Sequence, residues 1–328
     1  MQYRPLGKTG LSISAISFGA GPISQLLVGH DADRQRAVIQ HAIDRGINWF
    51  DTAATYGNGQ SEQNLGRVLN ELNAVHRVHI ATKVRLTPED LADIPGAIRR
   101  SVTASLERLR LPRVTLLQLH NSITKERGDE PSSITPQDVL GPAGVAKTFE
   151  RLRFEGVALH LGLTGLGQPA ALREVVASGR FETMQVPYQL LNPTAGWEFR
   201  GREREANYGN IISDCALQGM GVLAIRVFAG GALLGNPPSP HTLKTPFFPL
   251  ALYQRDGRRA ELLKSILGPE LPLAQAAVRF ALAHPFVHSA LTGFCRIGEI
   301  DEALQALDAG PSRIFWDDVL AALDAQAH

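Results

Sequence analysis

The 328-residue sequence has little cysteine and no recognisable metal-binding motif. Cys215 and Cys295 are its only cysteines, and they stand 80 positions apart. Neither belongs to a CxxC motif or to a cysteine and histidine cluster with metal-ligand spacing. We therefore expect no metal cofactor, and nothing in the sequence supports a disulfide bond.

Long apolar segments and an excess of charge of one sign are also missing. No apolar stretch approaches the ~20 residues that a transmembrane helix requires, and the opening MQYRPLGKTG lacks the apolar region of a signal peptide. The 33 Lys and Arg residues balance 32 Asp and Glu residues, which leaves a formal net charge of +1. These features predict a soluble cytoplasmic protein with neither nucleic acid nor a membrane among its partners.

A glycine-rich G-x-G-x-x-G turn between a strand and a helix is absent near the start of the chain. That turn is the fingerprint of the Rossmann dinucleotide site, so a Rossmann domain is not expected.

The chain instead alternates short apolar runs with longer amphipathic segments. We predict strands near 16–18, 47–50, 79–83, 114–119, 158–163, 183–186, 222–226 and 287–291. Helices are expected near 32–45, 61–72, 95–109, 143–154, 169–178, 208–218 and 272–283. Eight strands interleaved with helices favour a single (β/α)8 barrel domain over residues 1–328. Three stretches, 121–142, 193–207 and 229–256, are predicted to be loops over the carboxyl ends of the strands.

Four ionisable residues follow predicted strands. Asp51 and Tyr56 come after the strand at 47–50, Lys83 ends the next strand, and His120 follows the strand at 114–119. The carboxyl ends of barrel strands share one face, which carries the active site in this architecture. We therefore expect the four side chains to converge there, although Asp51 alone would suit a helix N-cap.

These residue types suit the reduction of a carbonyl by hydride. Tyr56 is the neutral proton donor of the set, and a free phenol with a pKa of about 10 needs help to act at neutral pH. The charge of Lys83 stabilises tyrosinate, Asp51 holds the ammonium group, and His120 is placed to hydrogen-bond the substrate carbonyl. The alternative is an Asp51–Lys83 ion pair that only braces the barrel. No side chain donates hydride, so a cofactor must supply it.

The motifs resemble those of the aldo-keto reductase superfamily over nearly the whole chain. They are YRPLGKTGLSISAISFGAG, DTAATYGNGQSEQNLGRVL, ATKV, SLERLRLPRVTLLQLH, LRFEGVALHLGLTG, MQVPYQLLN and AGGALLG. The resemblance implies an N-terminal β-hairpin before a TIM barrel and the same four catalytic residues. It also implies that NADP(H), or less often NAD(H), lies across the carboxyl-terminal face.

The resemblance also suggests cofactor contacts. Gln185 matches an amide that contacts the nicotinamide carboxamide, and Asp51 is a further candidate for a cofactor contact. Thr164 and Gly165 stand where relatives have Ser-Asn, so the asparagine contact is lost or replaced.

After the seventh strand, relatives often have an aromatic residue followed by Ser-Pro-Leu, whereas this chain has Ile225-Arg226-Val227-Phe228. Tyr188 or Phe228 is a candidate for stacking on the nicotinamide in place of the missing ring. Arg226 is a candidate for a phosphate contact, or else for solvent or a loop carboxylate.

The adenosine end is expected near the last barrel helix. Gly293 and free backbone N–H groups at the helix start suit a phosphate, and Arg296 suits a 2′-phosphate. Glu299 and Glu302 align with acceptors for adenine, while Ala303 replaces a common asparagine. We therefore favour NADP(H) over NAD(H).

We expect the substrate to be a small carbonyl or sugar, with Ala20, Gly21, Trp197 and Phe228 among the pocket walls. HLGLTGLG and QVPYQLLN resemble dehydrogenases of galactose or fucose. An aldose 1-dehydrogenase is therefore the first alternative to a carbonyl reductase. A non-catalytic, nicotinamide-binding regulatory subunit is the second.

Overall fold

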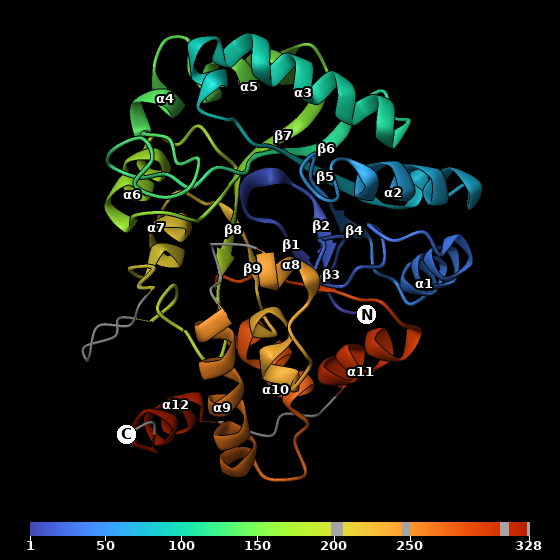
Figure 1. Ribbon diagram of the computed structural model, residues 1–328, viewed down its shortest axis with the longest axis vertical. Helices are drawn as coiled ribbons and strands as arrows, with labels where there is room; N and C mark the ends of the chain where they lie inside the picture. The colour runs from blue at the N-terminus through green and yellow to red at the C-terminus, as the bar shows by residue number, and fades with distance from the viewer. Residues whose placement is uncertain (198–205, 245–249, 309–314, 327–328) are drawn as a thin grey trace.

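The computed structural model describes residues 1–197, 206–244, 250–308 and 315–326. Eight parallel strands close into a barrel in the order β10-β3-β4-β5-β6-β7-β8-β9 (Figure 1). They are β3 (Ile16–Gly19), β4 (Trp49–Asp51), β5 (His79–Val84), β6 (Val114–Leu119), β7 (Ala158–Thr164), β8 (Thr183–Pro187), β9 (Gly221–Ile225) and β10 (Ser289–Gly293). The predicted (β/α)8 barrel is confirmed, with strand ends displaced by two residues at most.

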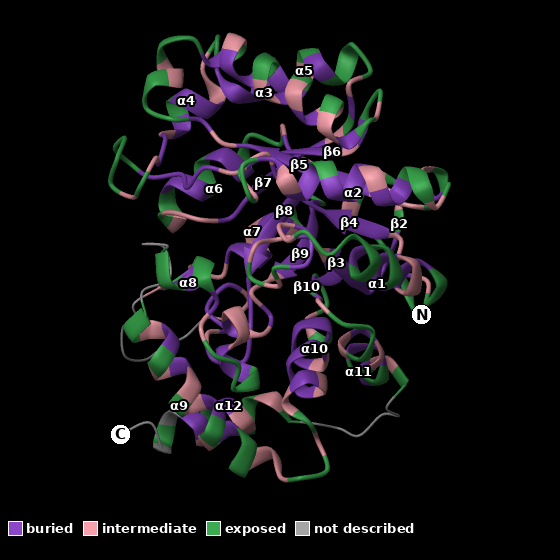
Figure 2. Ribbon diagram, turned by 45° about the vertical axis from the view of Figure 1, so that its right-hand side comes forward, coloured by how far each residue is buried: buried purple, intermediate pink, exposed green. Residues whose placement is uncertain are grey.

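Helices surround the barrel, with their buried sides toward the strands and their exposed sides toward solvent (Figure 2). They are α1 (Ala32–Asp44), α2 (Gln60–Glu71), α3 (Ile94–Leu109), α5 (Val145–Phe154), α6 (Pro169–Ala177), α7 (Ile211–Leu217), α10 (Leu273–Ala283) and α11 (Ile297–Asp308). Short 3-10 turns η2 (Val75–Arg77) and η3 (Glu89–Ala92) join some of them to strands.

A hairpin of β1 (Tyr3–Pro5) and β2 (Ser12–Ser14), joined through η1 (Gly7–Thr9), precedes the barrel as predicted. Leu6 and Ile13 of this hairpin are fully buried in one cluster with Trp49, Leu116 and other inward-facing strand residues. The hairpin therefore closes the amino-terminal end of the barrel with apolar side chains and leaves the opposite end open.

Two of the predicted loops contain helices. The segment 121–142 includes α4 (Pro136–Leu140), which begins at a capping box formed by Thr135 and Asp138. The segment 229–256 includes η4 (Ala229–Leu234), α8 (Pro240–Lys244) and the first residues of α9 (Leu250–Leu267). The prediction of continuous loops is wrong there. Of the third segment, 193–207, residues 198–205 lie outside the described residues.

There is a physical reason why the helix α9 was not predicted from the sequence. Its buried residues are only Tyr253, Asp256, Ala260 and Leu263, a narrow stripe that includes a charged residue and is interrupted by Gly257. A weak stripe of this kind gives little amphipathic signal. The C-terminal helix α12 (Trp316–Gln326), which packs beside α9, was likewise not predicted.

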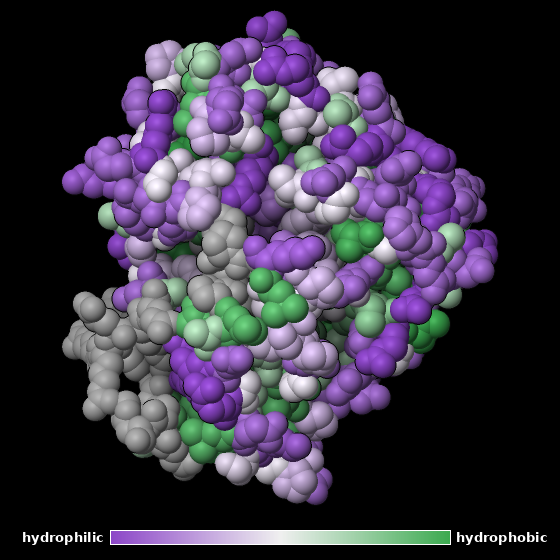
Figure 3. Space-filling model, viewed as in Figure 1, coloured by the Kyte–Doolittle hydropathy of each residue, from purple (hydrophilic) through white to green (hydrophobic). Residues whose placement is uncertain are grey.

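The space-filling view shows how polarity is distributed on one face (Figure 3). Hydrophilic side chains dominate the upper half, over α3 and α5, while hydrophobic ones are more frequent below, over the segments from α8 to α10. No helix among the described residues is long and apolar enough to cross a membrane.

Two helical glycines allow a matched test of this packing. A Cβ on Gly66 of α2 would lie 2.6 Å from the Leu109 carbonyl carbon, whereas a Cβ on Gly257 of α9 would meet nothing within 4 Å. We predict that Gly66→Ala lowers the free energy of unfolding by about 1–3 kcal/mol through overpacking. Gly257→Ala should raise it by about 0.4–1 kcal/mol by restricting the unfolded chain. Urea denaturation measures both, and equal effects would contradict the close α2–α3 contact.

Candidate active site

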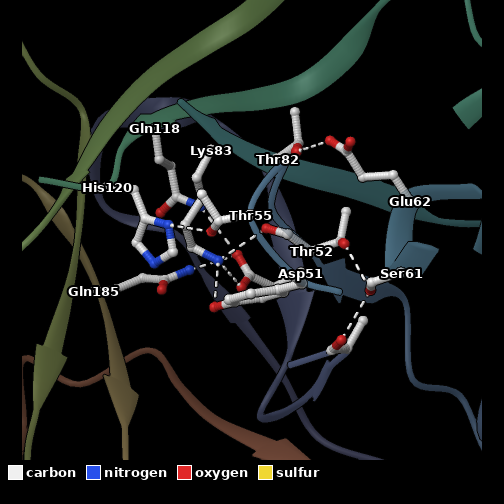
Figure 4. Close-up of polar contacts among 12 residues, drawn as sticks. Asp51, Thr52, Thr55, Ser61, Glu62, Thr82, Lys83, Gln118, His120 and Gln185 are labelled. Atoms are coloured by element: carbon white, nitrogen blue, oxygen red, sulfur yellow. Dashed lines mark hydrogen bonds and ion pairs between the residues drawn. The ribbon is translucent and has the colours of Figure 1, made fainter. Parts of the chain in front are cut away.

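Asp51, Tyr56, Lys83 and His120 come together at the carboxyl ends of β4, β5 and β6. The Lys83 ammonium group is at the centre: it pairs with Asp51 Oδ1 and donates to the Thr52 carbonyl oxygen at 2.9 Å and to Tyr56 Oη at 3.3 Å. Figure 4 shows Asp51, Lys83 and His120 pointing toward one another from neighbouring strands. The convergence expected from the sequence is therefore present in the structure.

The Asp51 carboxylate is buried, with further hydrogen bonds from two amides. Gln118 Nε2 on β6 donates to Oδ2 at 3.0 Å, and Gln185 Nε2 on β8 donates to the same oxygen at 2.5 Å. Both charges of the Asp51–Lys83 pair, each about 98% or more buried, are thus compensated by close partners. Sequence reasoning missed Gln118, although a lone glutamine in an apolar strand, on the same side as His120, was a usable signal.

Electrostatics fix the charge of two of these groups. Burial alone would lower the pKa of Lys83, but the Asp51 carboxylate and the Tyr56 hydroxyl outweigh it and raise that pKa above its usual range. Burial and the positive charges of Lys83 and Arg85 hold the pKa of His120 well below 6.5. At neutral pH, Lys83 is therefore an ammonium ion and His120 a neutral imidazole.

The His120 ring is positioned by its neighbours. Its backbone N–H donates to the Val84 carbonyl oxygen at 2.8 Å, and its Nδ1 lies 3.4 Å from Thr55 Oγ1. The ring meets the Tyr56 ring edge to face, with centroids 5.6 Å apart. Thr55 was not predicted as part of the site, because a residue beside a turn tyrosine carries no distinguishing pattern.

The first turn of α2 supports this arrangement from behind. Glu62 is fully buried and accepts hydrogen bonds from Thr82 Oγ1 at 2.5 Å and from Arg108 Nε at 2.7 Å. Ser61 Oγ donates to the Ala20 carbonyl oxygen at 2.8 Å and lies 2.8 Å from Thr52 Oγ1 (Figure 4). The Ser-Glu pair that follows the tyrosine turn therefore ties that turn to β5 and to the loop after β3.

A cavity of about 1680 Å³ opens over this end of the barrel. Asp51, Tyr56 and His120 line it, whereas Lys83 lies behind them. Thr164 and Thr292 also line the cavity, and their hydroxyl groups are buried without a hydrogen-bond partner among the described residues. Unpaired buried hydroxyls are costly, so a ligand with polar groups, such as a nicotinamide dinucleotide, fits this lining.

Most of the predicted cofactor contacts lie in this cavity. Its lining includes Asp51, Thr164, Gln185, Arg226, Phe228, Gly293, Arg296, Glu299 and Glu302. Gly165 is not part of the lining, and its N–H donates to the Gln185 carbonyl oxygen at 2.7 Å.

Of the two rings considered for nicotinamide stacking, only Phe228 lines the cavity. Tyr188 is buried and stacks on Phe280, with ring centroids 4.9 Å apart, and its hydroxyl accepts a hydrogen bond from Trp197 Nε1 at 2.7 Å. Tyr188 is therefore held in the protein core, away from the cavity.

Two of the residues predicted to contact the substrate, Ala20 and Trp197, do not line the cavity. Gly21 and Phe228 line it, but Ala20 is 1% exposed and is absent from the lining. Trp197 is likewise absent, because its indole is directed at Tyr188. The pocket wall expected from Ala20 and Trp197 is thus supplied by other residues, which include Thr55, Arg85 and Ser122.

The backbone N–H groups of Cys295 and Arg296 at the start of α11 are not free, contrary to the expectation from the sequence. The Glu299 carboxylate accepts from the backbone N–H of Cys295 at 2.7 Å and from that of Arg296 at 3.2 Å. It also forms an ion pair with the Arg296 guanidinium at 3.0 Å. The expectation is wrong for these two N–H groups because a side chain three residues along the helix caps them.

Metal ligands are not grouped in the part of the chain that the structure describes. No cluster of three or more His, Cys, Asp or Glu side chains is suited to hold a metal ion there. Cys215 and Cys295 are both free thiols.

Comparison with known proteins agrees with the family resemblance seen in the sequence. The model of the Aldo/keto reductase family matches residues 15–322. The chain is 28% identical to a D-threo-aldose 1-dehydrogenase of a Pseudomonas species, covering 89% of each chain. It is 25% identical to a probable voltage-gated potassium channel subunit beta of Arabidopsis thaliana, covering 95% of this chain and 92% of the relative.

Among solved structures, the holo form of an aldo-keto reductase from Bacillus halodurans superposes with a TM-score of 0.72 at 22% identity. The superposition covers 98% of this chain and 96% of the other. With a family model matched along almost the entire barrel, this chain belongs to the aldo/keto reductase family of oxidoreductases.

Proposed function

We propose that this oxidoreductase transfers hydride between a nicotinamide cofactor and a carbonyl or alcohol substrate, with Tyr56 as the general acid and base. The observation that carries the proposal is the 3.3 Å contact between Lys83 Nζ and Tyr56 Oη at the wall of the cavity. The cofactor supplies the hydride, which no side chain can donate. The residues of the chain move the proton and orient the substrate.

Tyr56 gives its hydroxyl proton to the carbonyl oxygen as the carbonyl carbon is reduced. The phenolate that remains is stabilised by the ammonium group of Lys83, which also lies 4.9 Å from the centre of the Tyr56 ring. In the oxidative direction the phenolate takes the proton from the substrate hydroxyl. Asp51 keeps Lys83 charged and in place throughout.

His120 orients the carbonyl as a neutral hydrogen-bond donor. A neutral imidazole donates from one nitrogen only, and which one is set by the partner of the other. When the Thr55 hydroxyl donates to Nδ1, the proton resides on Nε2, which is then the donor to the substrate oxygen. Thr55 would thereby select the useful tautomer.

The cavity lining suggests how the cofactor is held. Thr164 and Gln185 are suited to the nicotinamide carboxamide, and Phe228 to stacking on the ring. Arg226 is suited to a phosphate. The adenosine end would lie against α11, near Gly293 and Glu302.

Arg296 is the basis for proposing NADP(H) as the preferred cofactor, because a guanidinium binds a 2′-phosphate bidentately. Its ion pair with Glu299 works against that preference. Binding NADP(H) requires the guanidinium to exchange a carboxylate for the phosphate, whereas NAD(H) leaves the pair intact. The Arg296–Glu299 pair therefore sets how strongly the enzyme discriminates between the two cofactors.

Two alternatives follow from the relatives. Similarity to the D-threo-aldose 1-dehydrogenase supports oxidation of a sugar to its lactone by the same residues. Similarity to the probable potassium channel subunit supports a regulatory, nicotinamide-binding role. A substrate screen distinguishes both alternatives from the first proposal, because the three differ in which substrates, if any, the protein turns over.

Tyr56→Phe tests the proposed chemistry. In a screen at 340 nm, we predict that the wild-type enzyme reduces activated aromatic aldehydes with NADPH. The variant should lose about 10²–10⁴-fold in kcat, since a general acid is removed, while its dissociation constant for NADPH changes little. More than half of the wild-type activity in the variant would exclude Tyr56 from the mechanism. Turnover of free aldoses with NAD⁺ alone would favour the first alternative, and cofactor binding without any turnover the second.

The protonation state of His120 has a measurable effect on stability. Because its pKa is lowered on folding, the unfolded chain binds more protons at this site, and stability is lost as the pH falls below 6.5. We predict that the wild-type protein loses up to about 1.4 kcal/mol per pH unit below this point relative to His120→Gln. Urea denaturation of both proteins from pH 7.5 to 5 measures the difference. A difference that does not change with pH would mean that His120 is not held neutral.

Cofactor selectivity tests the Arg296–Glu299 pair. Arg296→Ala should weaken NADPH binding by roughly ten- to a hundredfold and NADH binding much less, as a charge-assisted contact to phosphate is lost. Glu299→Gln should strengthen NADPH binding selectively, because a competing carboxylate is removed. Isothermal titration with both cofactors gives the constants. Equal effects on NADPH and NADH would show that neither residue faces the 2′ position, and wild-type preference for NADH would overturn the NADP(H) assignment.

A further inference from the structure

We propose that Gln118 is a positioning residue for the proposed hydride transfer. Through its hydrogen bond to Asp51, it holds the carboxylate for Lys83 and for Gln185 at the same time. Gln118 thereby affects how readily Tyr56 releases its proton and how Gln185 meets the nicotinamide. The inference rests on the proposed function and adds to it a residue that does not line the cavity.

Gln118 lies in the layer of the barrel interior that contains the ion pair. It is fully buried on β6, two residues before His120, so both side chains face the same side of the strand. Its partners in register are Lys83 of β5 and Gly162 of β7. A Cβ on Gly162 would lie 3.2 Å from Gln118 Cγ, so the glycine leaves the room that the glutamine side chain needs. The amide can therefore reach the Asp51 carboxylate from inside the barrel.

The chemistry of a carboxylate fixes how the Gln118 amide is turned. An ionised carboxylate only accepts hydrogen bonds, so the nitrogen of the amide must face Asp51, and Nε2 donates to Oδ2 at 3.0 Å. The amide oxygen, Oε1, is buried without a hydrogen-bond partner among the described residues. An unpaired buried oxygen lowers stability, and an apolar side chain of similar size would avoid that loss. The contact with Asp51 is therefore the best reason for a glutamine at this position.

Gln118 shares its acceptor atom with a residue of the cavity wall. Gln185 Nε2 donates to the same Oδ2 atom of Asp51 at 2.5 Å, while Lys83 pairs with Oδ1 (Figure 4). Three donors on two oxygens leave the carboxylate little freedom to rotate. Gln185 lines the cavity, and with its nitrogen turned to Asp51 it presents Oε1 to a ligand. That oxygen suits the nicotinamide carboxamide, which has N–H donors.

The dipole of the Gln118 amide also bears on proton transfer. Its N–H group places positive charge toward Asp51 and offsets part of the negative charge of the carboxylate. Lys83, whose Nζ lies 3.3 Å from Tyr56 Oη, then stabilises the phenolate with less opposition. Without the amide, more negative charge remains beside Tyr56, and the phenolate is harder to form.

The charged and titratable groups near Tyr56 stay the same when Gln118 is changed. They are Lys83 and Asp51 of the ion pair, His120, whose ring meets that of Tyr56 edge to face, Arg85 on the cavity wall, and the Glu62–Arg108 pair of α2 and α3. A change in pH dependence is therefore attributable to the lost amide.

Gln118→Met tests the inference, because methionine is similar in size and has no amide. The kcat/KM values are measured from about pH 6 to 10 for reduction of 4-nitrobenzaldehyde with NADPH and for oxidation of 4-nitrobenzyl alcohol with NADP⁺. We expect the midpoints of both profiles to rise by about 0.5–1 pH unit, since phenolate formation is disfavoured. Oxidation below the midpoint then falls about three- to tenfold, whereas reduction persists to higher pH. General structural damage would instead lower both rates at every pH.

Cofactor binding gives the second measurement. Gln118→Met should raise the dissociation constant for NADPH about three- to tenfold, because Asp51 and with it Gln185 are held less firmly. The matched control is Gln189→Met. Gln189 is also buried with an unpaired Oε1 among the described residues, but it is outside the cavity lining. The control should change neither the midpoints nor the dissociation constant, and urea denaturation verifies that both variants fold.

The possible results distinguish a failure of this inference from a failure of the proposed function. If the wild-type enzyme turns over both substrates and Gln118→Met leaves the midpoints unchanged, the link to Tyr56 is overturned while the proposed hydride transfer stands. An unchanged dissociation constant for NADPH overturns the link to Gln185. Absence of turnover by the wild-type protein in both directions overturns the proposed function and this inference with it. If Gln118→Met does not fold, Gln118→Leu, which also lacks the amide, takes its place in the same measurements.

Discussion

The buried ion pair between Asp51 and Lys83 is the interaction on which the candidate active site depends. Placing two charges in the interior carries a desolvation cost of several kcal/mol per ion, which the attraction between them offsets only when further hydrogen bonds are made. Here those bonds come from Gln118, Gln185, Thr52 and Tyr56. They reach the pair from strands or strand ends on several sides of the barrel, so only the closed barrel can assemble them. An apolar pair of similar volume would often be no less stable, which makes chemistry the better reason for keeping the charges.

The support behind the pair explains why the sequence motif around it is long. Glu62 fixes Thr82, the residue before Lys83, and Arg108 of α3 completes the contacts of its carboxylate. Gly66, one helical turn further on, allows α2 to approach the end of α3 closely. The motif thus encodes the relative placement of α2, α3 and β5 in addition to the reacting groups. A displacement of about 1 Å in such supporting elements is enough to reduce catalysis severely.

The sequence predicted the elements and residues whose signals are local. Buried parallel strands appear as apolar runs, and a polar residue at the exit of each run marks the carboxyl face. Contacts that depend on three-dimensional orientation could not be predicted. Trp197 was assigned to the pocket from its loop position, yet its indole turns inward to Tyr188. Glu299 was expected to face a ligand, and it does line the cavity, yet its carboxylate also caps the start of α11, a contact that depends on how the side chain turns in the folded chain.

The positive charges of the site also act on the imidazole and on the substrate oxygen at once. Burial and, after it, the positive charges of Lys83 and Arg85 depress the pKa of His120, so the imidazole stays neutral. A neutral imidazole can orient a carbonyl oxygen without protonating it, and in the proposed mechanism Tyr56 delivers the proton. The same positive surroundings stabilise the negative charge that develops on that oxygen as hydride arrives. In the proposed mechanism, one set of fixed charges therefore separates two roles, orientation by His120 and proton transfer by Tyr56, between groups whose rings lie 5.6 Å apart.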